Sequence, residues 1–490
     1  MKVPFIKKFN YKGVNMKNEL KRGLKSRHLN MIAIGGTIGT GLFLASGYNI
    51  EKAGVGGGPL AYLIIGILVY FLMMGVGEMS TFLPTPGAYQ TFAGLFVHPI
   101  FGFAVGWNVW VNASISIGAE LVGGAMIMQQ FFPGINPVVW CIVIGVGILL
   151  LNLITVKAYG EAEFWFAGIK VVTIIAFMIT GILMVIGVIG NKGPIGFSNW
   201  TSASFMPNGI WAVALVSIGV IWSYLGVETV TIAAGETENP QLNVPKAIKT
   251  VFFRIVLFYV GSVTIIGLVV PYKNVDVLHN GYAGVFTMAG IGFGATLMNV
   301  VILTSLASCA NSVVYIASRM LMALAQEGKA PKVFGKINSR GIPVPAILLT
   351  MSIGFISILT NFISPDKVFV WLISIAGFNT LLTWFGILLS HVKFRKWLVK
   401  NGGKVENLKF KASFYPAAPI IALIFLIAIA IAMATSPDTR FSFLIGIPMM
   451  ALYFGIGYWQ YKKGNMIPPS YSEYLEANIK AKEPENLKVY

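Results

Sequence analysis

Charged residues are scarce in this chain of 490 residues. Asp, Glu, Lys and Arg together make up 11% of it, whereas soluble domains contain about 25%. Hydrophobic residues make up 56%. A soluble globular domain is therefore excluded, and the composition predicts an integral membrane protein.

Cysteine and histidine are also scarce, with two and four residues respectively. Cys141 and Cys309 both fall in apolar segments, where we expect small packing side chains rather than a disulfide. The four histidines lie at or near the ends of different apolar segments: His28, His98, His279 and His391. HExxH, CxxC, phosphate-loop and nucleophile-elbow patterns are absent from suitable contexts. We therefore expect no enzymatic activity, no metal and no cofactor.

Long apolar runs, in contrast, are abundant. A run of about 20 apolar residues is long enough to cross a bilayer as a helix. Twelve such segments occur: 29–49, 59–82, 100–130, 137–156, 164–189, 209–234, 248–270, 290–318, 343–363, 367–391, 416–435 and 441–461. The predicted fold is an all-α polytopic membrane protein with 12 transmembrane helices.

The distribution of basic residues predicts the orientation of the chain. If both termini are cytoplasmic, 29 of the 36 Lys and Arg residues lie on the inner side, 5 lie on the outer side, and Lys170 and Arg254 lie within spans. Cytoplasmic loops carry the excess of Lys and Arg in membrane proteins, which supports this orientation. Residues 1–28 lack the apolar core of a signal peptide, and the short tails favour a bacterial cytoplasmic membrane. The net charge of +18 then reflects topology and requires no nucleic-acid partner.

The first apolar segment contains a run that cannot hold a good helix. Residues 35–41 read GGTIGTG, and each interior glycine costs a helix about 0.5–1 kcal/mol relative to alanine. Within a bilayer, backbone that lacks helical bonds is tolerated only beside protein or a watery cavity. A broken first helix therefore indicates N–H and C=O groups that bind a polar ligand. Close packing of helices is the alternative reason for such glycines.

A second interruption lies five spans later. The sixth span carries Ser223–Thr229, with the sequence SYLGVET, near its middle. Paired breaks at matching positions are typical of transporters that are built from inverted repeats around a midplane site. The predicted organisation is a basic cytoplasmic tail at 1–28, a ten-helix core at 29–391 made of repeats at 29–189 and 209–391, a basic cytoplasmic loop at 392–415, two extra helices within 416–461 and a cytoplasmic tail at 462–490.

An amino acid is a ligand that suits such a break. Its carboxylate needs clustered N–H donors, which a helix N-terminus supplies together with a partial positive charge. Its ammonium group needs carbonyl oxygens, which the end of a half-helix leaves free. A helix that is interrupted at Gly39, Thr40 and Gly41 offers both in one place.

Several longer motifs resemble one family of proteins. GGTIGTGLF in span 1, WSYLGVETVTIAAGETENP across span 6, GEAEFWFAGIKV in span 5 and NSVVYIASRMLMALAQEGKAPKVF in and after span 8 are similar to the amino acid–polyamine–organocation superfamily. Within it, the chain most resembles bacterial permeases for lysine, aromatic amino acids and 4-aminobutyrate, over roughly residues 20–460. The resemblance implies two inverted five-helix repeats, as in sodium-coupled leucine transporters, with an amino acid bound between broken helices 1 and 6.

The resemblance also implies which positions bind the substrate. The carboxylate would meet the backbone at Gly39, Thr40 and Gly41, and the α-amino group would meet carbonyls in both breaks. The implied substrate-binding residues are Thr37, Ile38, Gly39, Thr40, Gly41, Trp222, Ser223, Tyr224, Leu225 and Glu228. Trp222 and Tyr224 would wall or gate the site, with ordinary packing as the alternative.

Lys170 is a lone lysine in the fifth span. An ionised lysine at the centre of a membrane helix costs about 2.5–3.5 kcal/mol. Burial favours the neutral amine, so Lys170 is able to exchange a proton. The resemblance implies that this lysine stands where sodium binds in sodium-coupled members and bonds a hydroxyl on helix 8, for which Ser308 and Ser312 are the candidates. The alternative is a side chain that extends to the cytoplasmic interface.

Other polar residues within or beside the spans are hypotheses for specificity or gating. Carboxylates within a membrane are functional candidates by default. Glu228 either holds the loose backbone of the second break or contacts the substrate. The further candidates are Glu120, Glu236, Asn311 and Asn379, and for the two asparagines bonding between helices is the alternative.

These features predict a secondary transporter that imports an amino acid by alternating access as a proton symporter. Glu120 and Glu228 favour lysine or another basic amino acid as the substrate. The alternatives are an amino acid/amine exchanger and a permease for neutral amino acids or 4-aminobutyrate. A channel is disfavoured, because a single asymmetric chain lacks the repeated selectivity rings that channels use. The predicted partners are the amino acid, the coupling proton and the lipid bilayer.

Overall fold

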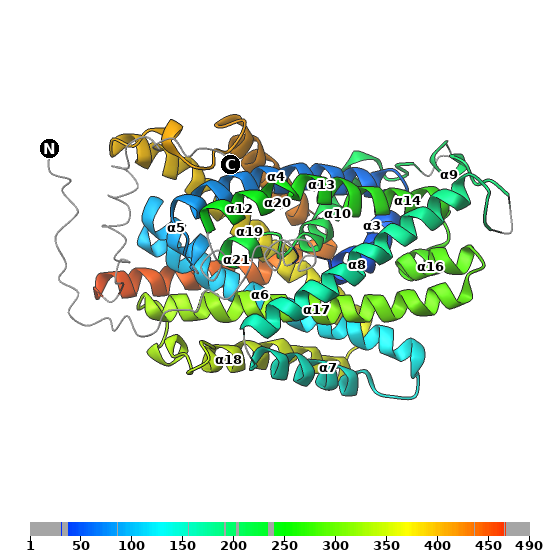
Figure 1. The fold of residues 1–490 in the computed structure, drawn as a ribbon, viewed down its shortest axis with the longest axis horizontal. Coiled ribbons are helices and arrows are strands. Elements are labelled where there is room, and N and C mark those ends of the chain that lie inside the picture. Colours follow the sequence, from blue (N-terminus) through cyan, green and yellow to red (C-terminus); the bar gives the residue numbers. More distant parts are fainter. Residues whose placement is uncertain are drawn as a thin grey trace, which may run out of the picture.

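The computed structural model of the chain describes residues 31, 38–85, 87–154, 156–190, 193–201, 205–233, 240–435, 437–464 and 466. In these ranges the regular secondary structure is helical, without strands. Long helices run side by side along the length of the molecule (Figure 1). Nine helices of the described part are long and apolar enough to cross a membrane. The expectation of an all-helical, multi-pass membrane protein is therefore confirmed.

From Ile38 onward, the described residues of the first half form eight helices. They are α2 (Thr40–Phe43), α3 (Ala45–Ala53), α4 (Gly57–Phe82), α5 (Ala88–Phe96), α6 (Pro99–Phe131), α7 (Pro137–Asn152), α8 (Val156–Val185) and α9 (Ser198–Thr201). His98 caps α6 through its side chain, and Asn136 caps α7 in the same way. Proline follows each of these caps at the first helical position, where its missing N–H costs nothing.

The second half begins with a span that is interrupted and continues with several short helices. It contains α10 (Gly209–Ser223), α11 (Thr229–Ala233), α12 (Pro240–Lys249), α13 (Val251–Arg254), the π-helix η2 (Ile255–Gly261), α14 (Ser262–Val269), α15 (Val275–His279), α16 (Gly281–Met288) and α17 (Gly292–Gln326). The 3₁₀ helix η3 (Lys332–Gly335), α18 (Val344–Gly354), η4 (Phe355–Asn361), α19 (Pro365–Lys400), η5 (Val405–Asn407), α20 (Ala417–Thr435) and α21 (Pro437–Lys462) follow.

Both predicted breaks coincide with interruptions in helical structure. Met31 is helical, but Ile38 and Gly39 are not, and α2 starts at the next residue. In the sixth span, α10 ends at Ser223 and α11 starts only at Thr229. Gly226 lies between them with φ of +90°, which glycine adopts without the strain that a Cβ atom would cause.

Two long helices form the centre of the bundle. α6 and α17 pack against each other, and α19 packs against α6. A short helix precedes each of the first two, α5 before α6 and α16 before α17. α5 lies at the left end of the bundle and α16 at the right end (Figure 1). The short helices α5 and α16 thus occupy opposite ends of the bundle.

One helix extends further than the sequence indicated. α19 continues to Lys400, beyond the predicted end of its span at residue 391. Phe394 and Leu398 are buried on one face of this extension, while Lys393 and Lys396 are exposed on the other. An amphipathic face of this kind continues a helix into water, because only one side needs apolar neighbours.

Candidate functional site

The two breaks meet at Gly41 and Ser223. A Cβ atom at Gly41 would lie only 2.4 Å from the Cα atom of Ser223, so the close approach requires glycine. The Ser223 hydroxyl donates to the Gly41 carbonyl oxygen over 2.6 Å. The Tyr62 hydroxyl of α4 donates to the same oxygen over 3.1 Å and lies 3.0 Å from the Ser223 hydroxyl. The broken helices are therefore joined by a buried hydroxyl network.

The start of α2 leaves backbone donors beside this contact. The N–H groups of Leu42 and Phe43 bond to the Gly39 carbonyl oxygen, each over 3.2 Å. The N–H groups of Thr40 and Gly41 stand ahead of these bonds, where helix geometry provides no intrahelical partner. The described part of the first break thus has backbone N–H groups at the start of a helix.

Glu120 lies directly against the first break. A Cβ atom at Gly39 would lie 2.8 Å from the carboxylate oxygen Oε1 of Glu120 and 2.8 Å from Sγ of Cys309. Any larger residue at this position would displace one of them. The structure therefore brings the predicted residue Glu120 to the break and adds Cys309 of α17, whose role the sequence did not indicate.

The second break is walled by aromatic side chains. The Trp222 indole is buried, its N–H finds no hydrogen-bond partner among the residues that the structure describes, and its ring stands edge-on to Phe369 at 5.9 Å between centroids. The Tyr224 ring stacks on Tyr259 of the π-helix at 4.3 Å. π-Helical turns are often found at functional sites, and this one places an aromatic side chain against the second break.

Glu228 is buried at the end of the second break. Within the described part of the chain, its carboxylate oxygen Oε2 has no hydrogen-bond partner, and the Trp384 indole lies nearby. Its backbone carbonyl oxygen accepts from the Tyr89 hydroxyl of α5 over 2.8 Å and from the Thr231 hydroxyl over 2.6 Å. The Glu228 backbone therefore links the second break to α5, and Oε2 is the oxygen of its carboxylate that lacks a partner within the described residues.

Lys170 of α8 lies inside the bundle, not at an interface. Its side chain is fully buried, and Nζ donates to the Ser308 hydroxyl over 2.9 Å. Ser308 in turn donates to the Glu163 carboxylate, at 2.7 and 2.8 Å from its two oxygens. The Ser312 hydroxyl also faces that carboxylate. The structure therefore brings Lys170 and Ser308 together, while Ser312 contacts Glu163.

Of the remaining predicted residues, some lie outside the described part of the chain and others lie beside the breaks. Thr37 and Glu236 lie outside the described residues, as does the side chain of Thr40. Ile38 is fully buried and Leu225 is partly buried beside the breaks.

The two predicted asparagines have different surroundings. Asn311 accepts a hydrogen bond of 2.7 Å from Asn152, so it bonds between helices. Asn379 accepts through its backbone oxygen from Asn108 over 2.8 Å, and no described residue bonds to its side-chain nitrogen.

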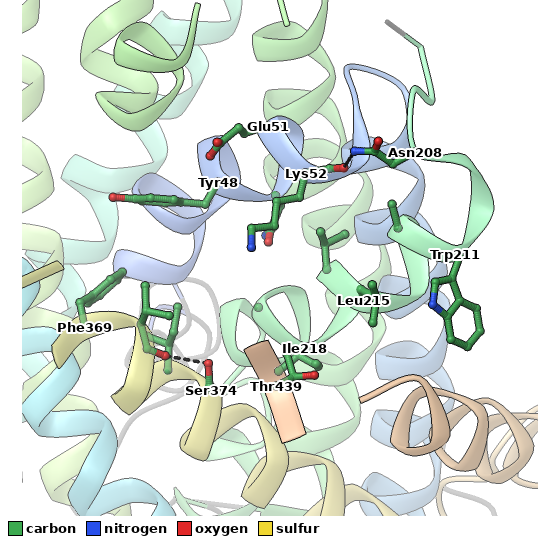
Figure 2. Close-up of a pocket in the computed structure, with 16 residues that line it drawn as sticks. Tyr48, Glu51, Lys52, Asn208, Trp211, Leu215, Ile218, Phe369, Ser374 and Thr439 are labelled. Atoms are coloured by element: carbon green, nitrogen blue, oxygen red, sulfur yellow. Dashed lines mark hydrogen bonds between the residues drawn. The ribbon is translucent and has the colours of Figure 1, made fainter. Parts of the chain in front are cut away.

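A cavity of about 610 Å³ lies beside the second break (Figure 2). Tyr48, Glu51 and Lys52 of α3 provide much of its polar lining, opposite the apolar side chains of α10. Phe369 lines the cavity and also contacts Trp222. The volume is in the range of cavities that hold small molecules.

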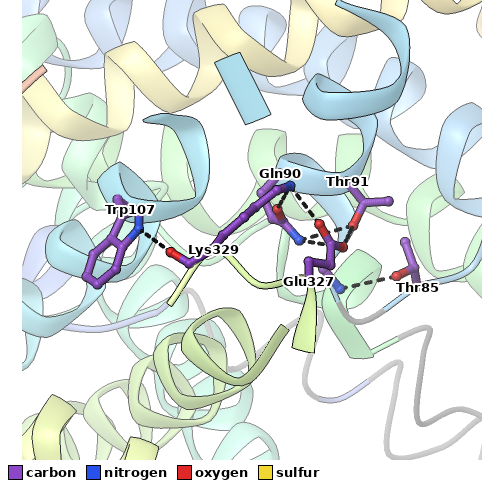
Figure 3. Close-up of polar contacts among 7 residues, drawn as sticks. Thr85, Gln90, Thr91, Trp107, Glu327 and Lys329 are labelled. Atoms are coloured by element: carbon purple, nitrogen blue, oxygen red, sulfur yellow. Dashed lines mark hydrogen bonds and ion pairs between the residues drawn. The ribbon is translucent and has the colours of Figure 1, made fainter. Parts of the chain in front are cut away.

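A second buried polar cluster joins α5 to the end of α17 (Figure 3). Lys329 pairs with Glu327 over 2.6 Å and donates to the Gln90 side chain over 2.7 Å. Gln90 and Thr91 both donate to Glu327, over 2.8 and 3.0 Å. Trp107 of α6 adds a bond of 3.1 Å to the Lys329 carbonyl oxygen. These bonds fix α5 against the central helices.

Fold and buried polar interior together define a multi-pass membrane protein with two interrupted helices at its centre. The amino acid permease family matches residues 28–466. The chain is 42% identical to the lysine-specific permease LysP of Escherichia coli (strain K12) over 84% of its length and 86% of the relative. It is 38% identical to the amino-acid permease RocE of Bacillus subtilis (strain 168), over 91% of its length and 96% of the relative. It is 40% identical to the histidine permease HisP of Lactococcus lactis subsp. cremoris (strain MG1363), also over 91% and 96%.

The chain therefore belongs to the amino acid permease family. It is a membrane transporter of amino acids and not an enzyme, as the sequence motifs predicted.

Proposed function

We propose that the protein imports an amino acid by alternating access, as a proton symporter in a bacterial cytoplasmic membrane with both termini inside. The observation that carries this proposal is the contact between the two breaks at Gly41 and Ser223. Substrate that binds between two half-helices links their movements, because each half-helix moves as a unit about its break.

A 5+5 inverted repeat with two extra helices, 12 spans in all, is part of the proposal. Two contacts support it. Tyr89 of α5, in the first predicted repeat, bonds to the backbone at Glu228 in the second break. In the second repeat, a Cβ atom at Gly281 of α16 would lie 2.3 Å from the carbonyl oxygen of Phe43 in α2, just after the first break. Each short helix therefore packs against the broken helix of the opposite repeat, as an inverted symmetry requires.

The proposed binding mode uses groups that all amino acids share. The substrate carboxylate accepts from the N–H groups of Thr40 and Gly41. The α-amino group donates to carbonyls of the first break near Thr37 and of the second break at Trp222, Ser223 and Leu225. Trp222 closes the site on the cavity side.

The proposed substrate is lysine or another basic amino acid. Glu120 against the first break provides acceptors for an additional cationic group, as does the Glu228 carboxylate oxygen that has no partner among the described residues. Relatives named for lysine and for histidine support this choice, whereas a relative named for gamma-aminobutyric acid supports the neutral alternative.

Lysine is expected to raise the thermal unfolding temperature of the purified protein. A ligand at about 100 times its Kd stabilises the folded state by about 2.7 kcal/mol. A screen of the twenty amino acids and 4-aminobutyrate measures this shift, and the neutral amino acids and 4-aminobutyrate serve as the controls. A shift with neutral amino acids and none with lysine, arginine or histidine would contradict the proposed substrate class.

Replacing Lys170 with alanine is expected to abolish accumulation driven by a proton gradient. With one proton for each amino acid, a gradient of one pH unit provides about 1.4 kcal/mol per molecule transported. This free energy supports about tenfold accumulation. Uptake into proteoliposomes under an imposed pH gradient measures this. Lys367→Ala, at an exposed lysine, is the matched control and keeps full accumulation. Full accumulation by Lys170→Ala would refute proton coupling through this residue.

Exchange is the second candidate function, because the sequence motifs do not separate symporters from exchangers. Wild-type protein in vesicles without internal amino acid distinguishes the two. A symporter takes up substrate into such vesicles, whereas an obligate exchanger takes up none.

A further inference from the structure

Glu163 has no role in the function proposed so far, yet it is a fully buried carboxylate next to Lys170. Both residues belong to α8 and are seven positions apart, so two helical turns place them on one face. The Ser308 hydroxyl of α17 bridges them, at 2.9 Å from the lysine nitrogen and 2.7 Å from the nearer carboxylate oxygen. A buried charge on either residue needs such a partner.

The direction of α8 gives the bridge an inner and an outer end. With cytoplasmic termini, α8 starts at the cytoplasmic side, so the Cα atom of Glu163 lies about 10 Å nearer the cytoplasm than the Cα atom of Lys170 at 1.5 Å of rise per residue. Ser308 is adjacent in sequence to Cys309, which lies against Gly39 of the first break. Lys170 is therefore linked to the broken helix through α17 and to the cytoplasmic side through Glu163.

We propose that Glu163 accepts the coupling proton from Lys170 through the Ser308 hydroxyl, on the path to the cytoplasm. This inference rests on the proposed proton symport. An N–H bond of the Lys170 ammonium breaks as its proton passes to the Ser308 oxygen, and the O–H bond of Ser308 breaks as its own proton passes to the Glu163 carboxylate. The result is a neutral amine, a restored hydroxyl and a neutral carboxyl group. Glu163 then releases one proton when the inner side opens.

Other groups around this bridge also titrate or carry charge. Glu120 of α6 and Cys309 of α17 interact electrostatically with Lys170. The helices that pack against α8 also contribute Cys141 of α7, Tyr259 of η2, Tyr282 of α16, and Tyr315 and Arg319 of α17 in their described residues. Glu163 is the carboxylate bonded to the same hydroxyl as Lys170, which singles it out from Glu120 as the acceptor.

Two variants test this proton relay, which runs from Lys170 through Ser308 to Glu163. Glu163→Gln removes the acceptor, and Ser308→Ala removes the bridge while both charged groups stay. Each is reconstituted in proteoliposomes and assayed with radiolabelled lysine in two ways, by accumulation under an inward gradient of one pH unit and by counterflow against internal lysine. Counterflow requires no net movement of protons. Glu406→Gln, at an exposed glutamate, is the matched control.

We expect both variants to keep counterflow near the wild-type rate and to lose the gradient-driven accumulation, about tenfold for one pH unit. Glu163→Asp, which keeps the carboxylate, is expected to restore part of the accumulation. If Glu163→Gln does not fold, Ser308→Ala alone decides the outcome.

Three results would overturn the relay: full accumulation by Glu163→Gln, full accumulation by Ser308→Ala, or loss of counterflow together with accumulation in both, which would indicate a structural role. A wild-type protein that shows counterflow but no gradient-driven accumulation would instead refute proton symport itself.

Discussion

Gly41→Ala is expected to reduce amino acid uptake about 100-fold, because a displacement of about 1 Å at a binding group costs a factor of this size. The new Cβ atom would lie 2.4 Å from the Cα atom of Ser223, and backbone on both sides leaves no flexible side chain to move away. The two breaks must then separate. Initial rates of uptake in proteoliposomes measure the effect.

The control for Gly41→Ala is a glycine with open space around it. Gly147 of α7 has no atom within 4 Å of an added Cβ, so Gly147→Ala is expected to transport at the wild-type rate. Equal uptake by both variants would show that the close approach of the two breaks is unnecessary for transport.

Lys329→Ala is expected to destabilise the protein by about 3–5 kcal/mol, the usual cost of leaving one member of a buried ion pair without its partner. Glu327 would remain buried beside Gln90 and Thr91 with its countercharge gone. The fall in thermal unfolding temperature of the purified protein measures the loss.

Two further variants test whether the loss of stability comes from the buried ion pair between Lys329 and Glu327. Lys332→Ala removes an exposed lysine three residues later and is expected to leave stability unchanged. The double variant Glu327→Leu with Lys329→Met is expected to recover most of the stability, because an apolar replacement removes both buried charges at once. A Lys329→Ala protein as stable as Lys332→Ala would contradict the importance of the cluster.

The interruptions of the helices could be predicted from local sequence. Glycine lowers helix stability wherever it occurs, so the runs around Gly39 and Gly226 indicated breaks without knowledge of the fold. The resemblance further predicted that a hydroxyl of the eighth span lies beside Lys170. Ser308 of α17, which is that span, lies there. The coupling role of this pair remains a prediction.

Contacts between distant segments could not be predicted in this way. The position of Glu120 against Gly39 depends on how far α6 is shifted along α17, which no local pattern encodes. Glu163 carried one usable signal, its spacing of seven residues from Lys170, but the bridging hydroxyl comes from another helix. The extension of α19 was missed because its charged residues suggested a loop, whereas Phe394 and Leu398 continue a buried face.

The crossed packing of α5 and α16 has a consequence for the chain as a whole. The second break takes the Tyr89 contact from the first half of the sequence, and the first break takes the Gly281 contact from the second half. Either half expressed alone would contain a broken helix that lacks part of its own support. Separately expressed halves are therefore expected to be inactive alone and to regain activity only when they are co-assembled. The two halves would then complement each other as fragments instead of folding independently.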